Sequence, residues 1–347
     1  MPRRKDRAGK PARYASSRHH DPLPFAAMAT GFVYHDRFLK HDTGPGHPER
    51  PDRLRAIVDG LRGDGSWDRL THLDFDPAPA SVLERLHSPG YVHRVFETCA
   101  SGLSYVDTPD SAVCEDSAEI AALAVGGVLR AVEAVVRGEV GNAFCAVRPP
   151  GHHAEVGRSM GFCLFGNAAL AADAAVRDHG LSRVAVVDFD VHHGNGTQHL
   201  LEDRADVLFA SLHEDPNHQY PGTGFAHETG RGDGDGFTLN VVLPSGSGDN
   251  ALLAAFNDAV APRLDAFKPE LLVFSAGFDA AADDPLGHLK VSPAGFNALA
   301  SSLLDVAQRH AAGRVVSVLE GGYDLDALSA AVSGHVGMLL DAAGGGA

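Results

Sequence analysis

Residues 184–195 read VAVVDFDVHHGN, and this stretch decides the fold. It begins with four apolar residues in a row, three of them valine, which is typical of a strand buried on both faces. Two aspartates and two histidines follow within six positions: Asp188, Asp190, His192 and His193. Carboxylates and imidazoles are costly to bury unless they are paired or bound to a metal. The stretch therefore predicts a core strand that ends at a metal or catalytic site.

Similar apolar, β-branched runs recur along the chain. They lie at residues 32–34, 143–147, 184–189, 207–211, 239–243, 271–275 and 315–319. Stretches with helical spacing separate most of them. We expect one helix with Ser117 as its N-cap and Gly138 at its end, and another between Asn167 and Gly180. Strands that alternate with helices predict a mostly parallel sheet with helices on both faces.

The composition suits one α/β domain. The chain has 347 residues, 44% of them hydrophobic, and no apolar run reaches the ~18 residues of a membrane span. The four cysteines form no Cys-x-x-Cys pair, which favours reduced thiols and a cytoplasmic location. We therefore expect no membrane partner.

The charge is distributed unevenly along the chain. Residues 1–27 hold seven basic and two acidic side chains, a net +5, so the overall charge of −16 leaves −21 for the rest. We expect residues 1–27 to form a disordered basic tail and residues 28–347 to form a single domain. The acidic body argues against nucleic acid as a partner and weakly favours cationic substrates.

Asp190, His192 and Asp279 form the most informative group of ionisable residues. Ligands of open α/β sheets bind at the carboxyl ends of the strands, and all three residues follow apolar runs. Asp190 and His192 alternate along an extended chain and so face the same side. Two carboxylates and one imidazole suit Zn²⁺ and are tolerable for Fe²⁺ or Mn²⁺. Three protein ligands leave positions for water and substrate, which is typical of a catalytic metal site.

Adjacent histidines in RPPGHHAEVG, His152 and His153, are the second signal. Histidine can act as a base toward water and as an acid toward a leaving amine near neutral pH. Each imidazole needs an acceptor behind it, and Asp188 and Asn195 are candidates because they flank the predicted ligands. The ordinary alternative is a pair of surface histidines, since the chain contains 20 histidines.

Tyr323 in LEGGYD is the third signal. Two glycines allow a sharp turn after an apolar run, and the phenol that follows can donate a hydrogen bond to a developing oxyanion. Taken alone, Tyr323 is better explained as a buried core tyrosine.

Together these residues resemble the zinc-dependent deacetylase superfamily, which comprises histone deacetylases, acetylpolyamine amidohydrolases and acetoin-utilisation proteins. The similarity runs from HDTGPGHPERPDRL at residues 41–54 to LEGGYDLDAL at residues 319–328. RPPGHHAE, DFDVHHGNGTQ, SAGFDAAADDPLG and EGGY are most similar to the class II branch. The resemblance implies the arginase–deacetylase α/β fold, with a central parallel sheet of about eight strands flanked by helices.

The resemblance also implies a role for each matching residue. One zinc ion per chain is bound by Asp190, His192 and Asp279. The implied catalytic residues are His153 as general base and proton donor with Asn195 behind it, His152 backed by Asp188, and Tyr323 polarising the carbonyl. The implied channel residues are Gly161, Phe162 and Tyr220, and the implied potassium site involves Asp188, Ser211 and Leu212. Arg53 resembles an arginine that lines an internal product pocket.

The implied reaction is hydrolysis of an acetyl-lysine-type or related N-acyl amine to amine and acetate. The polyamine-selective branch has a glutamate seven residues after the last zinc aspartate, where this chain has Leu286, so we favour acyl-lysine. Charge at the channel rim can still come from the acidic stretch at residues 105–119.

Several alternatives stay open at this point. An acetylpolyamine amidohydrolase or a small-molecule amidase would use the same site. An arginase-like ureohydrolase with two Mn²⁺ ions and a non-catalytic acetyl-lysine reader are more distant alternatives. The metal in the cell could be Fe²⁺ instead of zinc. Bacterial members are often dimers or tetramers, although no residue in the sequence specifies a homo-oligomer.

Overall fold

The computed structural model describes residues 28–344, so the tail expected at residues 1–27 lies outside the described residues. Eight strands form one parallel sheet in the order β2-β1-β3-β8-β7-β4-β5-β6. The strands are β1 (Thr30–Val33), β2 (Thr71–His72), β3 (Asn142–Cys145), β4 (Val184–Asp188), β5 (Val207–Glu214), β6 (Thr238–Leu243), β7 (Leu271–Ala276) and β8 (Val315–Leu319). The predicted parallel α/β sheet of about eight strands is confirmed.

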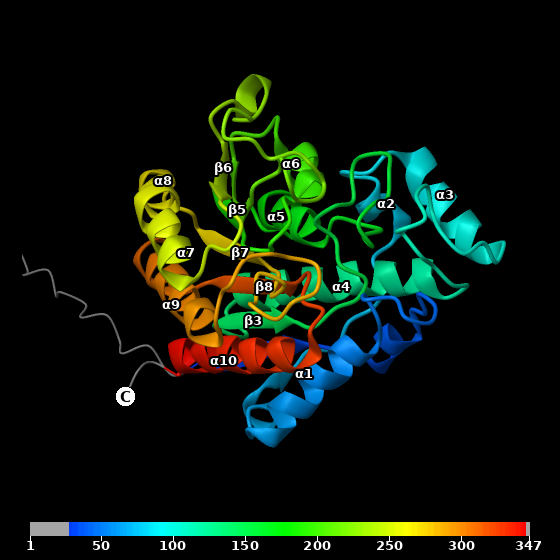
Figure 1. Cartoon of the computed structure of the whole chain (residues 1–347), viewed down its shortest axis with the longest axis horizontal. Helices are drawn as coiled ribbons and strands as arrows, with labels where there is room; N and C mark the ends of the chain where they lie inside the picture. Colours follow the sequence, from blue (N-terminus) through cyan, green and yellow to red (C-terminus); the bar gives the residue numbers. More distant parts are fainter. Residues whose placement is uncertain (1–27, 345–347) are drawn as a thin grey trace, which may run out of the picture.

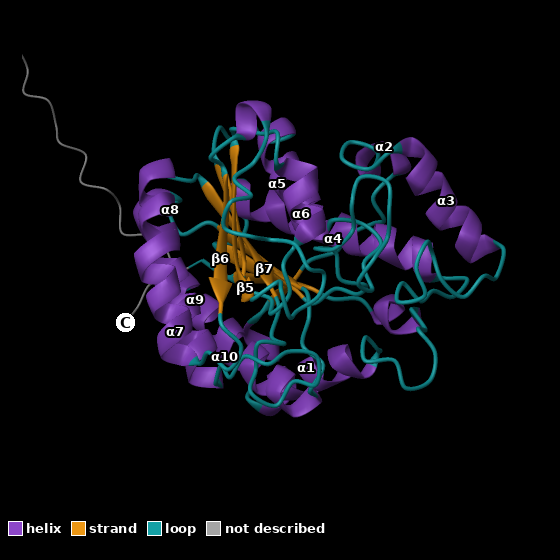
Figure 2. Cartoon of the chain, turned by 45° about the horizontal axis from the view of Figure 1, so that its top comes forward, coloured by secondary structure: helices purple, strands orange, loops and turns teal. Residues whose placement is uncertain are grey.

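Helices cover both faces of the sheet (Figures 1 and 2). They are α1 (Asp52–Gly63), α2 (Ala80–Leu83), α3 (Pro89–Ala100), α4 (Ser117–Val136), α5 (Asn167–Arg177), α6 (Asn195–Leu201), α7 (Asp249–Ala255), α8 (Ala261–Phe267), α9 (Pro293–His310) and α10 (Leu325–Ala343). Helices α4 to α6 lie on one face, and α1 with α7 to α10 lies on the other. Between residues 28 and 344, no helix combines the length and the apolar character needed to cross a membrane.

The central strands consist of apolar residues because helices bury both of their faces. Every residue of β4, β7 and β8 is buried. Strand β6 lies at the edge of the sheet, and three of its six residues are partly exposed. Continuous apolar runs are expected where both faces are covered, which explains why the central strands were the easiest to predict.

Five neighbouring strands, β3, β8, β7, β4 and β5, place the loops that carry the predicted site residues at one edge of the sheet. Because all the strands are parallel, their carboxyl ends meet there. In the sheet, Asp188 at the end of β4 pairs with Ser211 on one side and with Ser275 on the other. The segments that follow β4 and β7 carry Asp190 and Asp279, so residues far apart in sequence come together.

Several predicted boundaries differ from the structure by one to three residues, and two of them have a clear physical reason. Ser117 is the first residue of α4 and not its N-cap; its hydroxyl accepts from the Cys114 backbone N–H at 2.8 Å and lies 2.7 Å from His41 Nδ1. Strand β5 continues to Glu214 instead of ending at residue 211. Its last two residues, His213 and Glu214, are polar but buried, and both pair with β6. A run defined by apolar residues could not include them.

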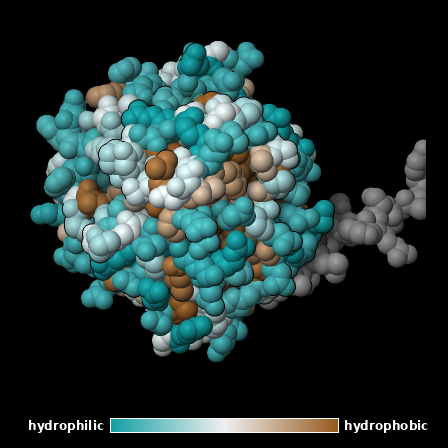
Figure 3. Space-filling model, turned by 90° about the vertical axis from the view of Figure 1, so that its right-hand side faces the viewer, coloured by the Kyte–Doolittle hydropathy of each residue, from teal (hydrophilic) through white to brown (hydrophobic). Residues whose placement is uncertain are grey.

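The surface of the domain is mostly hydrophilic on the side where α3 lies, with hydrophobic areas that are small and separated (Figure 3). Four large hydrophobic side chains are exposed among the described residues: Leu103, Tyr105, Val156 and Tyr220. Tyr220 is one of the predicted channel residues.

Candidate metal centre and active site

Asp190, His192 and Asp279 lie together where β4 and β7 end. One ligand atom from each residue lies within 4.8 Å of the other two. His192 Nδ1 is 3.0 Å from Asp190 Oδ1 and 3.2 Å from Asp279 Oδ2. All three side chains are buried. The structure thus brings together the three residues that the sequence predicted as metal ligands.

Backbone groups hold the two carboxylates in place. Asp190 accepts hydrogen bonds from the N–H groups of His192 and Gly321, both at 2.9 Å. Asp279 Oδ1 accepts one from Val191 N–H at 2.8 Å. A Cβ atom at Gly321 would lie 2.0 Å from Asp279 Oδ2, so the turn after β8 requires glycine at this position.

The site fits a divalent cation. Among the described residues, Asp279 Oδ2 is buried and receives no well-aligned hydrogen bond, although His192 Nδ1 lies 3.2 Å away, and this is costly for a carboxylate oxygen. Burial and the nearby Asp190 charge raise the pKa of Asp279 to about 7. Two buried carboxylates and an imidazole are ligands that zinc accepts in a catalytic site. A bound cation would neutralise both carboxylates and use the unpartnered oxygen.

His152 and His153 lie side by side, with ring centroids 4.0 Å apart. His152 Nδ1 is 3.1 Å from Asp188 Oδ2, and His153 Nδ1 is 2.7 Å from Asn195 Oδ1. The structure therefore places Asp188 and Asn195 behind the two imidazoles, as expected from the sequence.

The two histidines differ in their electrostatic surroundings. Burial lowers the pKa of His152, but the charges of Asp190 and Asp188 outweigh this effect and raise it to about 10. Burial lowers the pKa of His153 well below its ordinary value, and the neighbouring His152 and His192 lower it further. His152 is therefore cationic and His153 neutral at neutral pH. A neutral imidazole can accept a proton.

Tyr323 follows β8 through the turn at Gly321 and Gly322, and Arg53 supports this turn. Arg53 donates to Gly322 O at 2.6 Å and to Glu320 O at 2.5 Å. Its guanidinium also lies 4.9 Å from the centroid of the Tyr323 ring. Burial raises the pKa of Tyr323 well above its ordinary value, so the phenol keeps its proton and remains a hydrogen-bond donor.

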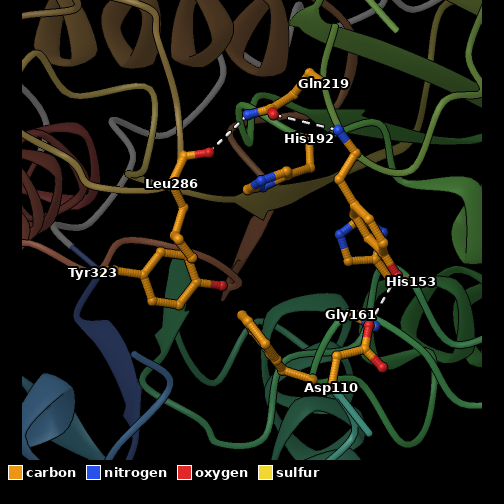
Figure 4. A pocket seen from close by; sticks show the side chains of 9 residues that line it. Asp110, His153, Gly161, His192, Gln219, Leu286 and Tyr323 are labelled. Atoms are coloured by element: carbon orange, nitrogen blue, oxygen red, sulfur yellow. Dashed lines mark hydrogen bonds between the residues drawn. The ribbon is translucent and has the colours of Figure 1, made fainter. Parts of the chain in front are cut away.

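A pocket of about 260 Å³ leads to these groups (Figure 4). Its lining residues are Asp110, His153, Gly161, Phe162, His192, Gln219, Tyr220, Leu286 and Tyr323. The predicted channel residues Gly161, Phe162, Tyr220 and Leu286 are all among them. A Cβ atom at Gly161 would lie 2.2 Å from His153 Cδ2, so a larger residue would displace the imidazole.

Gln219 and Asp110 contribute polar groups to the wall of the pocket. Gln219 Nε2 donates to Leu286 O at 2.7 Å and so connects two loops across the pocket (Figure 4). Asp110 Oδ2 accepts from Gly161 N–H at 3.0 Å and from the Tyr220 hydroxyl at 3.3 Å. Gln219 was not predicted from the sequence, where its position next to Tyr220 was the available signal. Asp110 was not distinguished there from the other acidic residues nearby.

The residues of the predicted potassium site lie on adjacent strands. Asp188 pairs in the sheet with Ser211, and Leu212 follows in β5. Both side chains also have protein partners: Ser275 Oγ donates to Asp188 Oδ2 at 2.9 Å, and Ser211 Oγ lies 2.8 Å from His213 Nδ1. Potassium binding stays a prediction.

The fold and the site define an α/β protein with a buried cluster of metal ligands beside a histidine pair. Residues 47–339 match the histone deacetylase domain family, and the chain belongs to this family.

Three similar proteins are named as deacetylases or amidohydrolases. A probable deacetylase of Archaeoglobus fulgidus is 37% identical over 86% of this chain and 82% of its own length. A histone deacetylase-like amidohydrolase of Pseudomonas aeruginosa is 39% identical over 85% of this chain and 81% of its own. The human polyamine deacetylase HDAC10 is 39% identical over 90% of this chain, which spans 48% of that protein.

The crystal structure of the HDA15 HD domain superposes with a TM-score of 0.85 at 39% identity and covers 90% of both chains. The family and these relatives identify the chain as an enzyme of the deacetylase class. This result disfavours both the ureohydrolase and the non-catalytic reader.

Proposed function

We propose that the protein is a zinc-dependent deacetylase that hydrolyses acetyl-lysine-type or related N-acyl amines to an amine and a carboxylate. The supporting observation is the cluster of Asp190, His192 and Asp279, with ligand atoms within 4.8 Å, beside His153 and Tyr323 at one pocket. When bound, zinc supplies a Lewis acid that polarises the acyl carbonyl and lowers the pKa of water.

His153 is the proton carrier in this proposal. Its neutral imidazole accepts a proton from the attacking water as the new C–O bond forms. The same proton passes to the leaving nitrogen when the C–N bond breaks, which gives the amine and a carboxylic acid. The acid then loses the second proton of the water, and the amine takes it up as an ammonium, so the products are a carboxylate and a protonated amine. His152, paired with Asp188, places a second imidazole beside His153 at the reacting groups.

Tyr323 is the oxyanion donor. Its phenol is neutral, lines the pocket and is fixed by the Arg53-supported turn. A hydrogen bond aimed at charge that develops only in the transition state accelerates the reaction without tightening substrate binding.

The pocket favours an acyl group on an apolar arm. The Phe162 ring packs edge-on against Tyr323 with centroids 5.8 Å apart, and the Tyr220 ring packs edge-on against His153 at 5.0 Å. Leu286 adds a third apolar side chain to the lining. Aromatic and aliphatic walls stabilise the methylene chain of an acylated lysine through apolar burial.

The substrate preference can be tested at Leu286. We expect a higher kcat/KM for an acetyl-lysine peptide than for N-acetylputrescine or N8-acetylspermidine, because Leu286 offers no charge to a distal ammonium. Leu286→Glu should shift the ratio of the two kcat/KM values toward the polyamines by about tenfold, or ~1.4 kcal/mol. Leu286→Gln is the matched control, since it adds polarity without charge. A tenfold preference of the wild-type protein for acetylpolyamines would instead favour an acetylpolyamine amidohydrolase.

We also propose that residues 28–347 form one domain and that the protein acts in the cytoplasm with one structural potassium ion. The cytoplasmic location is supported by the four free cysteines, three of which are buried. The potassium site is supported by the pairing of Asp188 with Ser211.

A further inference from the structure

A chain of hydrogen bonds connects His153 to the surface of the protein. His153 Nδ1 is 2.7 Å from Asn195 Oδ1, and Asn195 Nδ2 donates to Glu155 Oε1 at 2.8 Å. His199 Nδ1 lies 3.0 Å from the same Glu155 oxygen. Asn195 is 2% exposed, whereas the side chains of Glu155 and His199 are 24% and 43% exposed. The chain therefore runs from the buried pocket outward.

Glu155 determines which way the Asn195 amide points. An amide has an accepting oxygen and a donating nitrogen, whereas an ionised carboxylate only accepts. The amide nitrogen must therefore face Glu155, and the Met160 sulfur at 3.3 Å on that side is also an acceptor. The reversed amide would place its oxygen against the carboxylate. With the observed orientation, Asn195 Oδ1 faces His153.

The orientation of the amide in turn fixes the tautomer of His153. Because Asn195 Oδ1 can only accept, His153 Nδ1 must carry the hydrogen of the neutral imidazole. The other ring nitrogen, Nε2, is then left with its lone pair. His153 lines the pocket, so this lone pair is available to a proton donor there (Figure 4). The opposite tautomer would have its hydrogen on Nε2 and could not act as a base at that atom.

We propose that Glu155 is a positioning residue for catalysis: its carboxylate orients the Asn195 amide and thereby holds His153 in the tautomer whose Nε2 is a free base. The inference rests on the proposed function, because it takes His153 as the base.

The surroundings of Glu155 suit this role. The hydrogen bond from His199 lowers the pKa of Glu155 although partial burial opposes it, and the bond from Asn195 lowers it further. Glu155 is therefore ionised and a pure acceptor at neutral pH. Glu155 is also only two residues from His153, while Asn195 begins α6 with His199 one turn later, so one loop and one helix build the whole chain.

Glu155→Leu removes the acceptor and lets the Asn195 amide rotate. We expect kcat for an acetyl-lysine reporter to fall about 10–100-fold, the range typical when a metal-binding histidine loses its outer hydrogen-bond partner. KM should stay within about twofold and zinc content should stay at the wild-type level, because Glu155 touches neither substrate nor metal ligands. Glu202→Leu is the control, since Glu202 is another carboxylate near His199 but has no bond to Asn195.

A second substitution separates positioning from a merely structural role. In Glu155→Leu, the further change Asn195→Asp provides a carboxylate, which accepts at either oxygen and so fixes the hydrogen on His153 Nδ1 without Glu155. We expect the double variant to recover most of the lost kcat. In the wild-type background, Asn195→Asp places two carboxylates together and should lower kcat. A loss of kcat in Glu155→Leu that Asn195→Asp fails to recover would overturn the inference.

The tautomer can also be measured without any substrate. In protein labelled with ¹⁵N-histidine, the His153 signals can be assigned by their loss in His153→Ala. We expect protonated Nδ1 in the wild-type protein and a shift toward protonated Nε2 in Glu155→Leu.

An unchanged tautomer would overturn the inference even in an active enzyme. A changed tautomer in a protein that hydrolyses no acylated amine would support the inference and refute the proposed function. If Glu155→Leu does not fold, Glu155→Gln takes its place, with a smaller expected shift in the same direction.

Discussion

Replacing Asp279 by alanine is expected to abolish amide hydrolysis and to leave the protein without stoichiometric zinc. Asp279 supplies one of three ligand atoms, and its Oδ2 receives no well-aligned hydrogen bond from residues 28–344. Two remaining ligands cannot complete a catalytic zinc site, which uses three protein ligands and an open position. Zinc content and kcat of the purified variant measure the effect. Asp283→Ala is the matched control, because Asp283 is an exposed aspartate in the same loop.

The stability of the metal-free protein gives this prediction a second readout. The folded pKa of Asp279, about 7, lies above its ordinary value of 3.8. The Asp279 carboxyl therefore binds a proton more tightly in the folded state than in the unfolded state. This difference stabilises the folded, metal-free protein at low pH, and the stabilisation is lost as the pH rises from about 4 to 7. Asp279→Asn removes the charge, so at pH 7 and above it should stabilise the metal-free protein against urea. Full zinc occupancy in a folded Asp279→Ala protein would show that the ligand assignment is wrong.

Replacing His153 by alanine is expected to lower kcat by roughly 10²–10⁴-fold, the size of a lost general acid–base group. His153 is neutral, is fixed by Asn195 and lines the pocket beside Tyr323. The metal ligands are untouched, so zinc content should match that of the wild-type protein. Steady-state kinetics on an acetyl-lysine reporter and metal analysis measure the two quantities.

His218→Ala is the control for the His153 substitution, because His218 is exposed and does not line the pocket. Activity of His153→Ala within tenfold of wild type would remove this histidine from the mechanism.

The sequence predicted the sheet and the residues that follow its central strands. A strand buried on both faces needs apolar residues at every position, so β4, β7 and β8 stand out from their surroundings. Because parallel strands end at one edge, it also followed that Asp190 and Asp279 would meet despite their separation along the chain.

Contacts between segments that are distant in the sequence could not be predicted from the sequence alone. Arg53 donates to the carbonyls of Glu320 and Gly322, and the sequence around Arg53 does not identify these two partners. Glu49 is buried against Arg148 and Arg53, although charged residues are ordinarily assigned to the surface. The Glu49–Arg53 pair joins residues four positions apart, whereas the Glu49–Arg148 pair forms only when segments remote in sequence pack together.

The orientation of single polar side chains was also unpredictable. Gln219 joins the Tyr220 loop to Leu286 through one hydrogen bond, and Glu155 reaches His153 through Asn195. The sequence shows that both residues are near predicted site residues, but donor and acceptor geometry appears only in three dimensions.

The most direct test of the proposed metal centre is a titration of the chelated wild-type protein with zinc, followed by its rate of acetyl-lysine hydrolysis. We expect no turnover without metal, a rise in rate with added Zn²⁺, and a plateau at one zinc per chain. Turnover by the metal-free protein, or a rate that keeps rising to two metal ions per chain, would contradict a single catalytic zinc held by Asp190, His192 and Asp279.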